Sequence, residues 1–389
     1  MAILQQILGA IQRRDSSLSL PIANSATSAS RFREFGFALR GALAKPQGNV
    51  FFSPVGISLC LSMLIPAARG RTRDELRIVL GVSTADWDAL GGQLAELAKD
   101  GVLALTNGLF AQSGTSFLPD FEAGLGRSLG ASPQVLDFHE QPQESTQQLN
   151  HWCASETGGL IEQITERECL SNARLVLANA TCFHGDWDRP FRKRSTRWET
   201  FRGSKKSKVQ MMRQTLTARY AKNADFAAVD LPYFSGHRML IVLPEPDKTE
   251  EVFAAFDAKA FEAVFGTFSN RLVDLTLPRF TMDEETADLA QALVKLGIRE
   301  AFAESADLSG GTTGTLVSHV LHRSHLHVTE QGTEEAAVAA TVRRKANPRG
   351  RDLNPIDFRV GHPFLFVVCA PRTRTPVFIG QVRNLPSGY

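Results

Sequence analysis

The sequence predicts one large α+β domain that begins near residue 31. Its 389 residues are 43% hydrophobic and 22% charged, a composition typical of a globular chain long enough to bury a large core. Helical hydrophobic patterns prevail in the first half and strand patterns in the second, and no repeat or linker interrupts them after residue 31. We therefore expect mixed helices and several β-sheets in a single domain, 31–389.

Five segments carry helical signals. The helix that starts at Ser53-Pro54 is apolar almost all round, which predicts a buried position, and Pro suits a first helical turn. Gly residues end three of the other helices. The expected helices are 31–44, the segment from Ser53-Pro54 to about 68, 72–81, 145–164 and 288–298.

Strand signals are alternating or continuous apolar runs of strand length, which fit strands buried on one or both faces. The expected strands are 102–111, 174–183, 227–234, 239–245, 272–280 and 364–370, with a short one before Ser53.

Residues 1–30 are expected to form a flexible extension. Residues 2–11 are apolar, but no Lys or Arg precedes them, and QRRD follows in place of a small-residue cleavage site. This pattern disfavours a secretory signal peptide and favours an amphipathic turn or a frayed tail. Residues 15–30 are rich in Ser and Ala, as linkers are.

Charge and cysteine content exclude several classes of protein. The 43 Lys and Arg against 41 Asp and Glu leave a net charge of +2, which argues for neither nucleic-acid nor membrane binding by overall charge. The five cysteines are widely spaced without a CxxC pair, which excludes a disulfide framework and a Cys-based zinc module. Both a secreted and a cytoplasmic location are compatible with these thiols, which mildly favour a reducing compartment.

Two motifs suggest chemistry that their context does not support. GRSLG at 126–130 matches a hydrolase nucleophile elbow, but no strand precedes it and no helix start follows it. His319, His322, His325 and His327 have the spacing of a zinc site. On a strand, however, His325 and His327 would share one face and His322 would point to the opposite face. Packed or hydrogen-bonded histidines are therefore the default, and no metal is expected.

The segment 191–210 is basic, with Glu199 as its one acidic residue. Such a patch can attract a polyanion such as a heparin-like glycan, and a solvated edge strand protected by Lys would look the same. The candidate polyanion residues are Arg192, Lys193, Arg194, Lys205, Lys206 and Lys208.

The segment 328–362 is the least regular part of the chain. Its residues 336–341 are small, so they cannot build a core but would slide into a sheet without clashing. A loop of roughly 30 residues within a domain is normally functional or disordered. Trypsin-like proteases would recognise the basic residues that follow, which are Arg343, Arg344, Lys345, Arg349 and Arg351.

With these segments, the chain resembles the serpins, the serine protease inhibitor family, from about residue 31 to 386. NVFFSPVGISLCLSML resembles the family's helix entry, and LVLANATCFHGDWDRPF resembles its N-A-x-x-F-x-G-x-W-x-x-P-F segment. LTLPRF, LVKLGIREAF and ADLSG match the stretch before the loop, TEQGTEEAA resembles the hinge, and HPFLFVV with VFIGQVRNL matches the closing strands. Ala- and Arg-rich usage is typical of a bacterial-type member.

The resemblance implies a metastable fold with three β-sheets, eight or nine helices and an exposed reactive-centre loop at about 330–357. A target serine protease would cleave this loop and form an acyl-enzyme ester with it. The loop would then insert as a new strand of the main sheet and drag the protease along. The inhibitor would be a monomer that needs no catalytic group and no cofactor. The alternative is a non-inhibitory serpin that is a protease substrate, a ligand carrier or a chaperone.

Residue roles follow from the same resemblance. Ser53, Asn179 and His322, here called the shutter cluster, resemble polar residues where the sheet must part. Trp187, Arg279 and Glu330, the breach cluster, match the region where the loop first inserts, with Arg279 and Glu330 as an ion pair. The hinge residues are Glu330, Gly332, Thr333, Glu335, Ala336, Ala337 and Ala339. The Asn179-Ala-Thr sequon is expected to be interior and unmodified.

Two departures from the family pattern matter. Gly56 replaces the usual Ser three residues after Ser53, although Ser58 remains. Glu335 stands where the family prefers Ala, on the face that Thr333 shares and that would turn inward on insertion. Burying an unpaired carboxylate costs several kcal/mol, which would slow insertion and favour the non-inhibitory alternative.

Strand length predicts the reactive bond. A compact chain of this size is roughly 55 Å across, and a strand rising ~3.3 Å per residue crosses it in about sixteen residues. Counting from Glu330 reaches the bond between Lys345 and Ala346. GRDLNPIDF instead resembles relatives with an Arg at the position of Arg351, and Arg349 is also in range. We favour Lys345–Ala346, because strand length determines how far the protease is carried.

Overall fold

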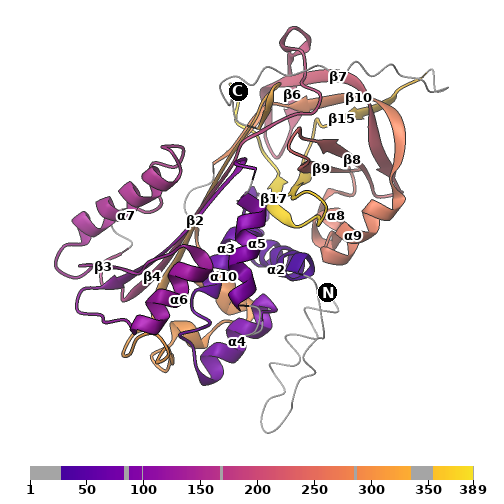
Figure 1. Ribbon diagram of the computed structural model, residues 1–389. Coiled ribbons are helices and arrows are strands. Elements are labelled where there is room, and N and C mark those ends of the chain that lie inside the picture. The colour runs from indigo at the N-terminus through magenta and orange to yellow at the C-terminus, as the bar shows by residue number, and fades with distance from the viewer. Residues whose placement is uncertain are drawn as a thin grey trace. The chain divides into compact units, whose positions relative to one another are not determined.

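The computed structural model describes residues 28–82, 87–98, 100–166, 170–283, 287–333 and 354–388. The chain folds as two compact units, each assembled from separate segments. The first unit comprises the residues up to 43, 53–182 and 284–324, and the second comprises 44–52, 183–283 and those from 325 onward. Figure 1 shows the described helices and strands.

The first unit holds seven of the nine α-helices in the described part of the chain. They are α2 (Ser28–Leu43), α3 (Pro54–Ser62), α4 (Gly70–Leu80), α5 (Trp87–Ala98), α6 (Pro119–Leu129), α7 (Pro142–Glu156) and α10 (Ala290–Leu296). Helix α3 is buried along its whole length, as its apolar sequence predicts. Helix α2 begins within the stretch that the sequence assigns to the flexible extension.

Local chemistry explains where several helices begin and end. The Ser53 hydroxyl accepts a hydrogen bond of 3.1 Å from the Gly56 N–H and caps α3, with Pro54 in its first turn. Gly81 and Gly297 end α4 and α10 in the left-handed conformation, which glycine adopts without strain.

Four helices were not predicted. Helices α5 and α6 each contain two glycines in their interior, which lowers helix propensity and hides the periodic pattern. Helices α8 (Thr249–Ala255) and α9 (Ala258–Thr267) lie in the second unit. The signal for α9 was present, because Asp257 is a capping residue whose carboxylate accepts the Ala260 N–H at 2.8 Å.

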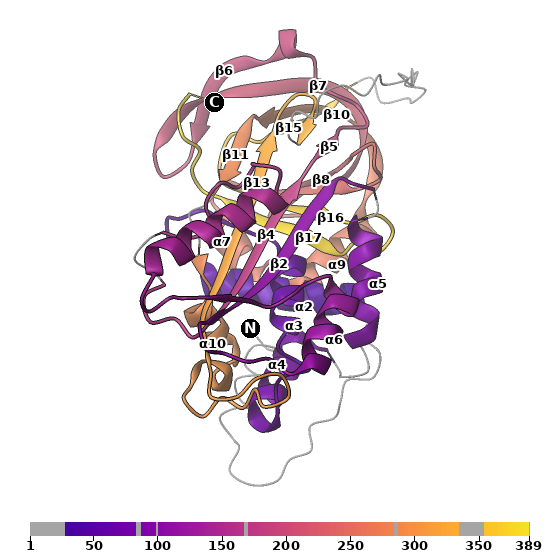
Figure 2. The same ribbon diagram turned by 60° about the vertical axis from the view of Figure 1, so that its left-hand side comes forward.

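One sheet follows the order β3 (Gln134–Leu136), β2 (Leu103–Gln112), β4 (Leu175–Phe183) and β13 (Val317–Val328). Most of these residues belong to the first unit, and β13 enters the second unit at His325. The short β12 (Ala287–Asp288) pairs with β13 as well. Figure 2 shows β2, β4 and β13 side by side. One apolar core lies against this sheet and includes Phe110, Leu149 and Val176, all of them fully buried.

In the second unit, the strand order is β1 (Val50–Phe52), β17 (Pro376–Val382), β16 (Phe364–Cys369), β9 (Arg238–Pro244), β8 (Phe226–Pro232), β7 (Lys206–Lys222), β10 (Ser269–Pro278) and β15 (Ile356–Arg359). Strand β6 (Arg197–Arg202) pairs with β7. Aromatic rings of Phe51, Phe366 and Phe378 pack in its core.

The expected α+β class is confirmed, whereas the three expected sheets are two within the described residues. The cause is β7, whose 17 residues pair with β6 at one end, with β10 along the middle and with β8 at the other end. Hydrogen bonds therefore join what the sequence predicts as separate sheets. Among the described helices, none has the length and apolar character needed to cross a membrane.

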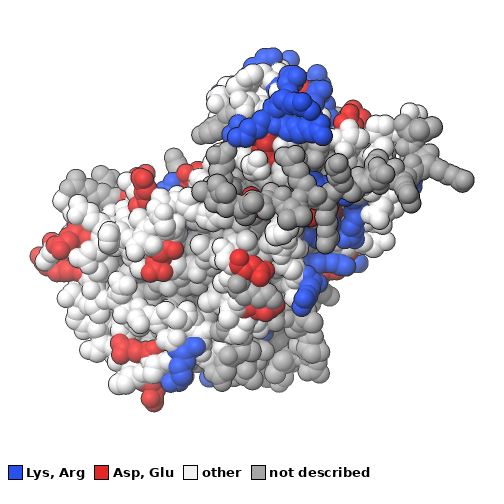
Figure 3. All heavy atoms as spheres, turned by 45° about the horizontal axis from the view of Figure 1, so that its top comes forward, with Lys and Arg blue, Asp and Glu red and all other residues white. Residues whose placement is uncertain are grey.

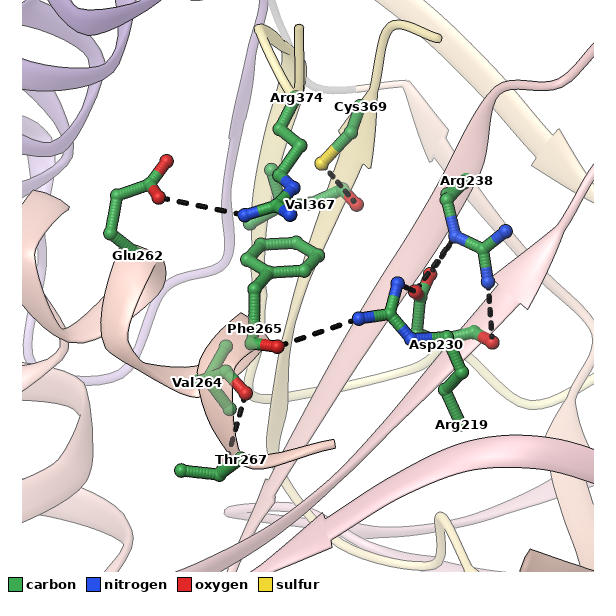
Figure 4. A network of polar contacts seen from close by, with 10 residues as sticks. All are labelled: Arg219, Asp230, Arg238, Glu262, Val264, Phe265, Thr267, Val367, Cys369 and Arg374. Carbon is green, nitrogen blue, oxygen red and sulfur yellow. Dashed lines mark hydrogen bonds and ion pairs between the residues drawn. The ribbon is translucent and has the colours of Figure 1, made fainter. Parts of the chain in front are cut away.

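A buried ionic network ties β7, β8 and β9 together. The Asp230 carboxylate is inaccessible to water and receives hydrogen bonds from Arg219 at 3.0 Å and from Arg238 at 2.7 Å (Figure 4). Arg374 lies 4.6 Å from the centre of the Phe265 ring and 3.7 Å from Glu262. These charges hold three neighbouring strands in one register.

Candidate functional site

The segment that resembles the hinge begins as a strand. Gly332 and Thr333 form β14, which lies between β13 and β5 (Gly185–Asp186) in the second unit. Thr333 pairs with Val328 on one side and with Gly185 on the other. A Cβ on Gly332 would lie 2.0 Å from the Gly185 carbonyl oxygen, so only glycine fits there. Two residues of the predicted hinge thus occupy a strand position in the sheet.

The Thr333 side chain is buried against two stacked aromatic rings. Its hydroxyl lies 2.7 Å from the Tyr233 hydroxyl, and Tyr233 stacks on Trp187 with ring centres 4.3 Å apart. Trp187 Nε1 donates to the Thr329 carbonyl at 3.0 Å. Burial raises the pKa of Tyr233, so its hydroxyl stays protonated and can donate. These contacts connect Thr333 of the hinge, through Tyr233, to Trp187 of the breach cluster.

Glu330 is buried and held from two sides. Its carboxylate accepts the Thr196 hydroxyl at 2.6 Å and lies 3.7 Å from Arg279 Nε. Arg279 also donates to Gln210 at 2.9 Å. The structure therefore brings Arg279 and Glu330 together in the pair that the sequence suggested. The sequence did not predict a role for Thr196 or Tyr233, although Tyr233 lies in the predicted strand 227–234.

The shutter cluster gathers in the first unit around His322. One ring nitrogen, Nδ1, lies 2.8 Å from Asn179 Oδ1, and the other, Nε2, accepts the Ser53 backbone N–H at 3.0 Å. The Ser324 hydroxyl lies 2.9 Å from the same Nε2. Because Nε2 accepts, the proton sits on Nδ1 and is donated to Asn179. The ring therefore links the start of α3 to β4 and β13.

Burial lowers the pKa of His322 to about 3, so the ring is neutral near pH 7. A second proton on Nε2 would face the Ser53 N–H, which is itself a donor. Asn179, fully buried, also accepts the Thr181 hydroxyl at 3.1 Å and donates to the Thr106 carbonyl at 2.9 Å. Its sequon is interior, as expected.

Gly56 lies directly against this cluster. A Cβ there would lie 2.4 Å from Asn179 Oδ1 and 2.6 Å from Thr181 Oγ1. Glycine therefore fits this position better than the usual Ser, because Asn179 and Thr181 fill the space that a side chain would need. Ser58, two residues further on, is also buried.

Much of the predicted loop lies outside the described residues. This holds for the later hinge positions and for every candidate reactive residue, and these remain predictions. They are Glu335, Ala336, Ala337, Ala339, Lys345, Ala346, Arg349 and Arg351.

The basic segment is exposed in the second unit. Figure 3 shows Lys and Arg gathered on the face that comes forward from the top of Figure 1, where β6 and β7 are drawn. All six candidate side chains are exposed: Arg192, Lys193, Arg194, Lys205, Lys206 and Lys208.

The two alternative motifs have structural roles. Ser128 of GRSLG lies inside α6 and is buried, so it is not on a strand-to-helix turn. His319 Nδ1 lies 2.7 Å from Asp288 Oδ2, and His325 Nδ1 lies 3.8 Å from Asp283 Oδ2. Within the described ranges, no group of three or more His, Cys, Asp or Glu side chains could hold a metal ion.

Comparison with known proteins agrees with this arrangement. The family model described as Serpin (serine protease inhibitor) matches residues 30–385. An uncharacterized serpin-like protein of Thermococcus kodakarensis is 33% identical over 381 residues, which are 95% of this chain and 87% of that protein. Serpin B3 of Homo sapiens is 30% identical over 86% of this chain and 93% of its own length.

Solved structures show the same fold. Human thyroxine-binding globulin, complexed with its hormone, superimposes with a TM-score of 0.82 at 26% identity over 92% of this chain and 98% of that one. Family members are protease inhibitors rather than catalytic enzymes, although non-inhibitory members exist. The family-model match over residues 30–385 and the identity to these relatives lead to one conclusion: the chain belongs to the serpin family.

Proposed function

We propose that this chain is a suicide-substrate inhibitor of serine proteases that cleave after basic residues. Strand β14 is the observation that carries the proposal. It occupies a place between β13 and β5, so Gly332 and Thr333, which lead into the loop, are already paired in the sheet. A strand begun in this way can lengthen by adding one residue after another, because each new residue adds ladder bonds.

The chemistry belongs to the protease. Its serine oxygen attacks the carbonyl carbon of the reactive residue, the peptide bond breaks, and the new amino terminus leaves with the proton from the serine. The ester that remains ties the protease to the loop. If the loop then lengthens β14 between β13 and its neighbour, the protease is carried along before water hydrolyses the ester.

The shutter cluster would control this lengthening. Strand β13 pairs with β4 in the first unit, and His322 joins both strands to Ser53 through neutral hydrogen bonds. An inserting strand must replace the β4–β13 pairing. Each neutral bond contributes about 1 kcal/mol, and breaking it leaves no buried charge unpaired, as separating a buried ion pair would.

Basic specificity is proposed from the loop sequence. Lys345 follows Arg343 and Arg344, and the strand-length count ends at the Lys345–Ala346 bond. Mass analysis of the peptide released by trypsin tests this point. A fragment that starts at Ala346 supports the proposal, and one that starts at Gly350 or Asp352 assigns the bond to Arg349 or Arg351.

A non-inhibitory serpin is the second candidate. Glu335 favours it, since an inward carboxylate would oppose insertion two residues after the buried Thr333. Thyroxine-binding globulin, a structural relative, is known in complex with a hormone. In that case the loop would be cleaved without trapping the protease.

Incubation with trypsin followed by a denaturing gel separates the two candidates. An inhibitor yields a band of serpin plus protease that survives SDS, whereas a substrate yields only cleaved chain. Glu335→Ala is expected to raise the ratio of complex to cleaved chain, and Thr333→Arg, which places a charge in the buried position beside Tyr233, is expected to abolish the complex. An unchanged ratio for Glu335→Ala would remove the concern about its burial.

A further inference from the structure

The β6–β7 hairpin in the second unit has one face fixed to the core and one turned to solvent. Phe201 and Val209 are fully buried on the inner face, and the Phe201 ring lies 6.4 Å from that of Phe364. Alternate residues point the other way. Trp198 is 53% exposed there.

The outer face collects cations without counter-charges. Lys208 stands opposite the neutral Thr200, whereas Arg202 stands directly opposite Lys206, so like charges meet across neighbouring strands. Such pairs destabilise a sheet. The side chains of Arg202, Lys206 and Lys208 form no hydrogen bond or ion pair with any of the described residues.

The one carboxylate on β6 is used elsewhere. Glu199 forms ion pairs with Arg213 and Arg359. It therefore contributes nothing to neutralising the outer face. The charge of that face remains available to an acidic partner.

The position of the hairpin suggests which partner. Strand β7 pairs with β6 at one end and with β10 further along, and β10 pairs with β15, which starts at Ile356, at the end of the predicted reactive loop (Figure 1). Through Val273 of β10, Ile356 lies two strand spacings, about 10 Å, from Leu216 of β7. Lys208 lies eight residues from Leu216, about 27 Å along β7. A protease of about 240 residues is roughly 45 Å in diameter, so one that is bound to the loop can also cover this face.

We infer that the outer face of the β6–β7 hairpin, with Trp198, Arg202, Lys206 and Lys208, is a second docking surface for the target protease and selects proteases with an acidic surface beside their active site. The inference rests on the proposed function, since it assigns a partner already engaged by the loop. Trp and Arg are the residues most enriched at protein–protein contacts. A single-stranded nucleic acid would instead need several aromatic rings in a row, and Trp198 is the one exposed large aromatic side chain on β6 and β7 in the described structure.

The test compares anionic and cationic trypsin, which share specificity for basic residues but differ in surface charge. The rate at which intact chain disappears, as complex or as cleaved product, is measured for wild type and for the double variant Lys206→Glu, Lys208→Glu. The control variant Lys259→Glu, Lys295→Glu changes net charge equally at exposed sites elsewhere. Because disappearance is counted whether or not a complex forms, the result is independent of the proposed inhibition.

At low salt, the hairpin variant is expected to react about tenfold more slowly with anionic trypsin and nearly normally with cationic trypsin, a difference that salt should diminish. Trp198→Ala should slow anionic trypsin as well. Equal rates for the hairpin and control variants with anionic trypsin would overturn the inference. If the hairpin variant in that case also loses binding to dextran sulfate, the face is a polyanion site instead. Cleaved chain without complex would refute the proposed function alone.

Discussion

Two buried polar networks, one around Asp230 and one around His322, are built from opposite chemistry. In the second unit, Asp230 carries a full charge between Arg219 and Arg238 and joins strands that stay paired. In the first unit, His322 is neutral and joins Ser53 and Asn179 where the proposed mechanism requires strands to separate. The contrast suggests that the Asp230 ion pairs secure a sheet that stays intact and that the neutral hydrogen bonds of His322 serve the other sheet, which must open.

The largest effect is expected from breaking the ionic network. Asp230→Asn leaves Arg219 and Arg238 without their shared counter-charge, at positions about one third exposed. We expect a loss of about 3 kcal/mol in the free energy of unfolding, the low end for a broken buried pair because water reaches both guanidinium groups. Urea unfolding measures it. Asp274→Asn, at an exposed position on β10, is the control, and an equal effect of the two would contradict the assigned role.

Lowering the pH should destabilise the fold through His322, at the centre of the neutral network. The pKa of His322 is lowered by burial to about 3, below its ordinary value, so the unfolded chain takes up a proton that the folded chain refuses. The stabilisation is fully present above about pH 6.5 and is lost as the pH falls toward 3. Near pH 5 the loss from this group is about 2 kcal/mol.

Unfolding of wild type and of His322→Gln between pH 7 and pH 4 isolates this contribution from other titrating groups. We expect a shallower pH dependence for the variant. Parallel curves for the two proteins would show that His322 does not titrate in this way.

A smaller effect is expected where the shutter cluster is packed most tightly. Gly56→Ala should cost about 1 kcal/mol, because the added Cβ must push Asn179 or Thr181 aside. Gly41→Ala on α2 is the matched control, since a Cβ added there would have nothing within 4 Å, and it should stabilise by about 0.5–1 kcal/mol. Stabilisation by both substitutions would show that the cluster has room to adjust.

The sequence predicted elements with strong local patterns and missed those decided by tertiary packing. The buried helix after Ser53 and the strands β4, β8 and β9 follow from apolar runs and caps. Helices α5 and α6 have interior glycines, and their helical state depends on contacts that no local pattern reveals. The joining of sheets through β7 is equally non-local.

The candidate site shows the same division. Ser53, Asn179 and His322 were found through a family resemblance, since they lie far apart in the chain and no spacing rule connects them. Thr196 and Tyr233 belong to no motif, and only the fold reveals that they hold Glu330 and Thr333. The suitability of Gly56 also required the position of Asn179.

Loop insertion is the central claim of this account, and the stability of the cleaved chain tests it most directly. The loop is cut with a limited amount of trypsin, and urea unfolding of the cut chain is compared with that of the intact chain. If the loop lengthens β14, the cleaved protein should remain folded at urea concentrations that unfold the intact protein, and Thr333→Arg should remove this gain. Equal unfolding midpoints for intact and cleaved wild-type chains would contradict insertion.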